Sequence, residues 1–156
     1  MRYRQAIALL ALVGFFVALY LWLHALGYGG AIKCGASGGC EVVQTSQWAV
    51  FLGLPVAFYG VVGYVAVFGV ALAALKPAAL AERHWNVLLA GLTSVGFLFT
   101  VYLTYLELFV IHAICRWCVG SAVIITLIWI VSLLSLKSPA TRTGLGASPQ
   151  PQGPPA

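Results

Sequence analysis

Charged residues are scarce in this sequence, and acidic residues are the scarcest. Only 7% of the 156 residues are charged, with eight Lys and Arg against three Asp and Glu, whereas 62% are hydrophobic. Soluble domains are typically about 25% charged and about 45–50% apolar. The composition therefore excludes an ordinary soluble domain and indicates a membrane protein. The net charge of +5 does not indicate nucleic-acid binding, because the basic residues lie at the ends of apolar runs.

The sequence contains four long apolar runs without any charged residue. They are Ala6–Leu26, Leu52–Leu75, Asn86–Leu106 and Trp117–Leu136. Each has about the 20 residues that a membrane-spanning helix needs, and a backbone in lipid must satisfy its own hydrogen bonds. The sequence predicts an all-α membrane protein, a four-transmembrane-helix bundle, with a Gly-rich extracytoplasmic loop between the first and second helices. We found no internal repeat, phosphate-binding glycine loop or soluble domain.

The few basic residues predict the orientation in the membrane. With four spans, six of them fall on one side, namely Arg2, Arg4, Lys76, Arg83, Lys137 and Arg142. Only Lys33 and Arg116 fall on the other side. The positive-inside rule then places both termini in the cytoplasm of a multi-pass protein of the cell (inner or cytoplasmic) membrane. A cleaved signal peptide is the alternative for the first run, but its apolar stretch exceeds the roughly 7–15 residues of a signal core.

Cysteine is also rare, and its placement is informative. Cys34 and Cys40 lie in the first outer loop, and Cys115 and Cys118 lie at the outer start of the fourth helix. All four therefore face the oxidising side, where disulfides form and persist. Three of the five residues between Cys34 and Cys40 are glycine, which predicts a mobile link.

The second pair has the spacing Cys115-Arg116-Trp117-Cys118. At a helix start, residues i and i+3 share one face. The helix N-terminus carries about half a positive charge, and Arg116 adds a cation nearby. Such surroundings lower a cysteine pKa and favour the reactive thiolate. The spacing therefore predicts a reactive thiol pair.

Three interpretations of the cysteines compete. They form structural disulfides in a membrane scaffold, they bind a metal, or they relay electrons by thiol–disulfide exchange. The metal interpretation lacks a second C-x-x-C motif, so we predict no metal site. The relay explains the mobile link, since Cys40 has to leave Cys34 and reach Cys115. We therefore expect residues 1–137 to form a four-helix membrane redox domain. Residues 138–156, with five prolines, are expected to be a disordered Pro-rich cytoplasmic tail.

The arrangement of these motifs resembles the vitamin K epoxide reductase family, and its prokaryotic members most of all. The resemblance rests on the cysteines at 34, 40, 115 and 118, on Ser46, and on Gly53-Leu54-Pro55 before the second helix. It implies a helix bundle around a membrane quinone, either menaquinone or ubiquinone, with the head group near the C-x-x-C. It also implies re-oxidation of an extracytoplasmic thioredoxin-like protein, which supports disulfide bond formation. The enzyme alternative is the other four-helix quinone-dependent disulfide oxidase class, whose C-x-x-C lies in the first outer loop.

The resemblance also implies a role for each cysteine. Cys34 exchanges with the partner protein, Cys40 shuttles to Cys115, and Cys118 faces the quinone. Some prokaryotic members carry a fused thioredoxin-like domain. Here only the Pro-rich tail follows the fourth helix, so we expect the partner to act in trans.

Two further positions are implied near the quinone. Ser46 matches a family serine close to the redox cysteines, and Ala122 stands where some members carry a tyrosine. Glu107, His112 and His24 lie at the outer ends of predicted helices and are candidate proton relays, since histidine titrates near neutral pH. The sequence assigns no role to any of these three.

Overall fold

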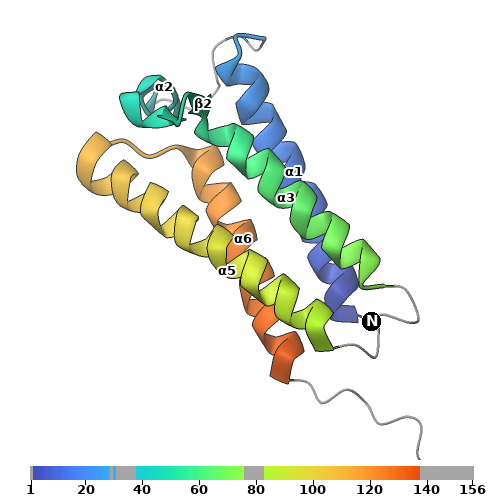
Figure 1. Ribbon diagram of the computed structural model, residues 1–156. Coiled ribbons are helices and arrows are strands. Elements are labelled where there is room, and N and C mark those ends of the chain that lie inside the picture. The colour runs from blue at the N-terminus through green and yellow to red at the C-terminus, as the bar shows by residue number, and fades with distance from the viewer. Residues whose placement is uncertain (1, 29, 31–37, 76–82, 138–156) are drawn as a thin grey trace, which may run out of the picture.

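The bundle is built from four long helices joined in an up-and-down order. The computed structural model describes residues 2–28, 30, 38–75 and 83–137. The long helices are α1 (Arg2–Ala25), α3 (Val56–Ala73), α5 (Arg83–Tyr105) and α6 (Arg116–Lys137), and they lie side by side (Figure 1). Within the described residues, four helices are long and apolar enough to cross a membrane. The predicted all-α four-helix membrane fold is confirmed.

The outer surface of the bundle is strongly apolar. At most 33% of any candidate span is buried inside the protein. Large side chains such as Phe16, Val62, Leu98 and Val123 are more than half exposed. An apolar surface of this extent is unfavourable in water but suits the hydrocarbon core of a bilayer. The bundle is therefore that of a multi-pass membrane protein.

Small residues allow α1 and α3 to approach each other closely. Gly14 of α1 lies under the ring of Tyr64 of α3, so that a Cβ at position 14 would overlap the ring atoms. Gly60 lies against Ala18 in the same interface. α1 also packs along α6, and α5 packs along α6, whereas α3 and α5 have few contacts. Helices in membranes typically pack through such small residues.

A buried arginine joins three helices at the end of the bundle where the N-terminus lies (Figure 1). Arg4 is only 6% exposed. Its guanidinium donates to the Asn86 Oδ1 atom of α5, at 2.9 and 3.2 Å, and to the carbonyl of Ala74 at the end of α3. These bonds satisfy a charge that would otherwise be costly to bury. α6 ends at this same end of the bundle, opposite the cysteine-bearing segments (Figure 1).

The segment that leads into α3 is more structured than a long apolar run predicts. After α2 (Gly39–Thr45) and a short 3-10 turn, Gln47–Ala49, the strands β1 (Val50–Phe51) and β2 (Leu54–Pro55) form an antiparallel hairpin. Its turn places Leu52 and Gly53 at φ values of 51° and 81°. The predicted start of the second span at Leu52 is therefore wrong. The helix begins at Val56, because Pro55 is still extended, with φ −56° and ψ 135°.

The third span is longer than the sequence predicts. α5 continues into η2, a π-helical segment over Leu106–Ile111, and only His112–Cys115 connect it to α6. The predicted end at Leu106 was set by the charge of Glu107, but Glu107 is 7% exposed and lies inside the protein.

The predicted mobile link runs over residues 35–39. Its last two residues are ordered, because Gly38 is the N-cap of α2 and Gly39 begins that helix. Residues 35–37 and the tail at 138–156 lie outside the described residues, so these expectations stay predictions.

The Gly14–Tyr64 contact can be tested by adding a single methyl group. Gly14→Ala should lower the free energy of unfolding by about 1–3 kcal/mol, because the Tyr64 ring has to shift from a packed position. Gly69→Ala in α3 is the matched control, since a Cβ there meets nothing within 4 Å. Unfolding in mixed detergent micelles measures both. Equal stability of the two variants would contradict the close α1–α3 packing.

Candidate functional site

The centre of the site is a buried cluster that brings together one cysteine from each sequence pair. Cys40, in the first turn of α2, and Cys115, just before α6, are both 0% exposed. They share this cluster with Leu21 and Val43, and Cys118 packs against it. Cys40 of the first pair therefore meets both cysteines of the second pair at one end of the bundle.

The absence of a side chain at Gly39 allows this meeting. A Cβ built on Gly39 would lie 2.5 Å from the carbonyl oxygen of Ile114, in the turn before α6. Gly38 precedes it as the N-cap of α2, with a left-handed φ of 59°. The last two residues of the Gly-rich spacer thus have defined positions. One starts α2, and the other lets it rest directly on the backbone next to Cys115.

The two cysteines of the C-x-x-C motif are free thiols, whereas Cys40 is in a disulfide. Cys34 lies outside the described residues, so its predicted role stays a prediction. The expected position of this motif is confirmed, because Cys115 directly precedes α6 and Cys118 lies in its first turn.

Hydrogen bonds at the start of α6 lower the pKa of Cys115. The hydrogen bond with the Cys118 side chain is the main cause that lowers the pKa of Cys115, against the opposing effect of burial. The backbone N–H of Cys118 also donates to the Cys115 Sγ atom at 3.3 Å. Arg116 is exposed and does not contribute to this shift. The predicted low pKa holds, but its cause is the helix start and the neighbouring thiol rather than the cation.

Two polar residues contact the C-x-x-C motif: Gln44, which the sequence analysis missed, and Glu107, which it named as a candidate proton relay. Gln44 of α2 lies with its Nε2 atom 3.8 Å from the Cys118 Sγ atom. The Glu107 Oε2 atom accepts the backbone N–H of Cys115 at 3.3 Å, and the carboxyl group also interacts electrostatically with the Cys118 side chain. Gln44 follows Cys40 by four residues, so a helix beginning at Gly39 would have placed both on one face.

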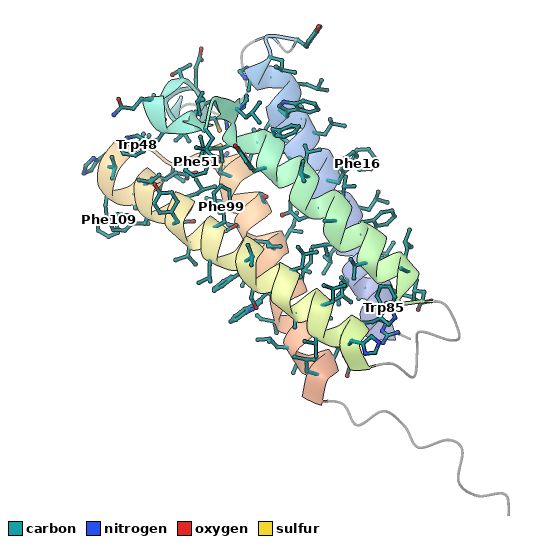
Figure 2. The ribbon with its side chains drawn as sticks, viewed as in Figure 1. Phe16, Trp48, Phe51, Trp85, Phe99 and Phe109 are labelled. Carbon is teal, nitrogen blue, oxygen red and sulfur yellow. The ribbon has the colours of Figure 1, made fainter. Side chains whose placement is uncertain are left out.

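A cavity of about 450 Å³ lies beside Cys118, where α3 and α5 leave the bundle loosely closed. Its walls are mainly apolar, and Trp48, Phe51 and Phe99 from three different segments gather around it (Figure 2). Polar side chains form the smaller part of the lining. They include Gln44, Ser46, Tyr59, Tyr64, Thr100, Thr104, Glu107 and Ser121. Small-molecule sites typically have this volume and this mixture of apolar walls and few polar groups. The lining therefore fits a flat, largely apolar quinone ring.

Both positions implied near a quinone line this cavity. Ala122 contributes a small apolar surface to the wall, one turn after Cys118. The Ser46 hydroxyl donates to the Val43 carbonyl at 2.8 Å and so closes the end of α2. The nearest polar group to Ala122 in sequence is Ser121, whose hydroxyl lies 2.9 Å from the Tyr64 hydroxyl. A contact of Ser46 or Ala122 with a quinone stays a prediction.

Of the three candidate proton relays, Glu107 lies at the cavity, whereas His112 and His24 do not. Glu107 lines the cavity and is buried. His112 follows η2 in a left-handed conformation, with φ 55°, and His24 lies in the last turn of α1. Neither histidine lines the cavity. In the described part of the chain, no cluster of three or more His, Cys, Asp and Glu residues could hold a metal ion.

The contact at Gly39 can be tested with a chain that keeps only Cys40 and Cys115. In a Cys34→Ala, Cys118→Ala background, mild oxidation should form a Cys40–Cys115 disulfide, because the two residues share one buried cluster. Adding Gly39→Ala should slow this bridge about fivefold or more, the equivalent of about 1 kcal/mol of steric cost.

Gly30→Ala is the matched control, since a Cβ there meets nothing within 4 Å. Bridge formation is read from non-reducing peptide maps. An unchanged rate in Gly39→Ala would contradict the close packing of α2 on the Ile114 backbone.

Comparison with known proteins agrees with this geometry. A model of the vitamin K epoxide reductase family matches residues 5–133 of the chain. The matched region contains all four cysteines, the cavity and almost the whole of every long helix. The chain therefore belongs to the vitamin K epoxide reductase family and is a multi-pass membrane oxidoreductase.

Proposed function

We propose that this protein re-oxidises an extracytoplasmic thioredoxin-like protein in trans and passes the electrons to a membrane quinone, which supports disulfide bond formation. The observation that carries the proposal is the shared burial of Cys40 and Cys115, with Cys118 between them and an apolar cavity. Cys34 exchanges with the partner protein. The quinone, menaquinone or ubiquinone, accepts two electrons and two protons when bound.

The contacts of Cys40, Cys115 and Cys118 support a definite order of exchange. The partner's thiolate attacks Cys34, which frees Cys40 as a thiolate. Cys40 attacks Cys115, the Cys115–Cys118 disulfide breaks, and the electron pair leaves on Cys118. Because Cys40 and Cys115 already pack together, this transfer needs only a local rearrangement. Among the described cysteines, Cys118 lines the cavity, which supports it as the sulfur that passes electrons onward.

The cavity lining supports the quinone as the acceptor. Leu21, Val67 and Ile125 offer apolar walls, while Gln44 and Ser121 offer hydrogen-bond donors of the kind that a quinone carbonyl accepts. The tyrosine that some family members carry at position 122 is absent. Tyr64, which donates to the Ser121 carbonyl at 3.0 Å, keeps a phenol in the same part of the cavity.

Two alternatives to this proposal differ from it in the substrates consumed or in the position of the C-x-x-C motif. A disulfide-braced membrane scaffold would consume neither thiols nor quinone. The other four-helix quinone-dependent oxidase class is disfavoured, because its C-x-x-C lies in the first outer loop, whereas here the C-x-x-C begins α6.

A coupled assay tests the activity. Purified protein mixed with a reduced thioredoxin-fold protein and a short-chain quinone should reduce one quinone for every two thiols oxidised. Cys115→Ser and Cys118→Ser should each reduce this rate to background, because the disulfide that receives electrons is gone. Gly69→Ala, in open space away from the cysteines, is the control and should keep the wild-type rate. A wild-type protein that consumes neither substrate would favour the scaffold.

The proposed orientation can be tested with reporter fusions. We propose that both termini are cytoplasmic and that the four cysteines face outward, from the six-to-two division of basic residues between the two sides. A reporter fused after Leu136 should be active only in the cytoplasm. One inserted between Gly35 and Gly39 should be active only outside. A C-terminal reporter active outside would place the cysteine cluster of a four-span bundle on the cytoplasmic side and would contradict exchange with an extracytoplasmic partner.

A further inference from the structure

Glu107 is a buried carboxyl group inside a candidate membrane span. It is 7% exposed and lies within His84–Ile111. Burying an ionisable group in such a place is unfavourable unless the group has a function or close partners. Glu107 lies in η2, and π-helical turns often occur at functional sites. The burial of Glu107 in a π-helical turn therefore indicates a function for this carboxyl group in addition to packing.

The contacts of Glu107 all lead to the redox pair. Its Oε2 atom accepts the Cys115 N–H at 3.3 Å, and its carboxyl group interacts electrostatically with the Cys118 side chain, which lines the same cavity. From α3, the phenols Tyr59 and Tyr64 line the same cavity. Among the described residues, no cation is recorded as a partner of this carboxyl group. Glu107 therefore lies between the reacting sulfurs and the cavity, and within the described residues its side chain has no cationic partner.

We propose that Glu107 is a catalytic residue that gives a proton to Cys118 when the Cys115–Cys118 disulfide opens and removes it when the disulfide closes. This inference rests on the proposed thiol relay and adds its proton path. A residue needed only to accept the Cys115 N–H would not have to be ionisable, since a glutamine oxygen accepts the same bond.

The opening step is balanced within the protein. A Cys40 thiolate attacks the Cys115 Sγ atom, the Cys40–Cys115 bond forms, and the Cys115–Cys118 bond breaks with its electron pair on Cys118. The Glu107 carboxylic acid donates its proton to this sulfur. It becomes a carboxylate that the Cys115 N–H stabilises. In the closing direction, the carboxylate takes the proton from the Cys118 thiol and produces the thiolate that reacts.

The test uses quinone-free protein, so that it does not depend on turnover. In a Cys34→Ser, Cys40→Ser background, prior oxidation can form only the Cys115–Cys118 disulfide, and a small dithiol then opens it. The opening rate is read from alkylation of the released thiols. Fluorescence of Trp117 is a second readout, because this residue lies between the two cysteines in the sequence and its ring packs 5.0 Å from that of Tyr20. Glu107→Gln should slow opening about 100-fold, the lower end of general acid catalysis. Glu107→Asp, which keeps a carboxyl group, should restore part of the rate.

The pH profile separates proton transfer from a structural role. Expressed per reagent thiolate, the rate with Glu107 should fall as pH rises, because the carboxyl group loses the proton that it donates. The rate of Glu107→Gln should not change in this way. Glu41→Gln, an exposed acid on α2, is the matched control and should keep both the rate and the profile. A Glu107→Gln variant within about threefold of the parent rate, with the parent pH profile, would overturn the proposal.

A second measurement uses the wild-type protein and avoids any effect of substitution on folding. The infrared difference spectrum between the oxidised and reduced forms should contain a protonated-carboxyl band in the oxidised form only. No such band would also overturn the proposal. Because neither measurement contains quinone or partner protein, both results stand whatever the coupled assay finds. Failure of Glu107 is thereby distinguished from failure of the proposed function.

Discussion

The contact of Gly39 with the backbone of Ile114 is the constraint on which the site depends. Because position 39 carries no side chain, α2 rests directly on the turn that leads into α6. This contact buries Cys40 beside Cys115 and brings Gln44 near Cys118. A relay between the cysteine pairs then needs no long movement of Cys40. The same packing keeps water away from the sulfurs, which strengthens every electrostatic interaction among them.

The uneven packing of the long helices provides the second half of the site. α1 joins α3 closely through Gly14 and Tyr64, and it also packs on α6. α3 and α5 are left with few contacts, and the cavity lies between them. Tyr64 links these features, since its ring covers Gly14 while its hydroxyl bonds with Ser121 beside the cavity. A substitution that shifts this ring would therefore affect both helix packing and the shape of the cavity.

The sequence predicted the features that depend on composition and spacing. Uncharged runs of about 20 residues identified the four spans, and the i, i+3 spacing placed Cys115 and Cys118 at a helix start. The hairpin at Leu52–Gly53 was missed because its residues are as apolar as the span that follows. α2 was missed because a glycine-rich loop indicates mobility, whereas Gly39 is required by a close approach. The inward position of Glu107 depends on a π-helical turn, which hydrophobic periodicity does not reveal.

The central claim is that electrons pass from Cys40 to Cys115 and leave through Cys118. A Cys118→Ala chain tests it most directly, because it lacks the thiol that would resolve a Cys40–Cys115 disulfide. After exposure to a reduced thioredoxin-fold protein and re-oxidation, non-reducing peptide mapping should find Cys40 linked to Cys115, with turnover lost. A map that shows only a Cys34–Cys40 disulfide, with Cys115 free, would contradict the account.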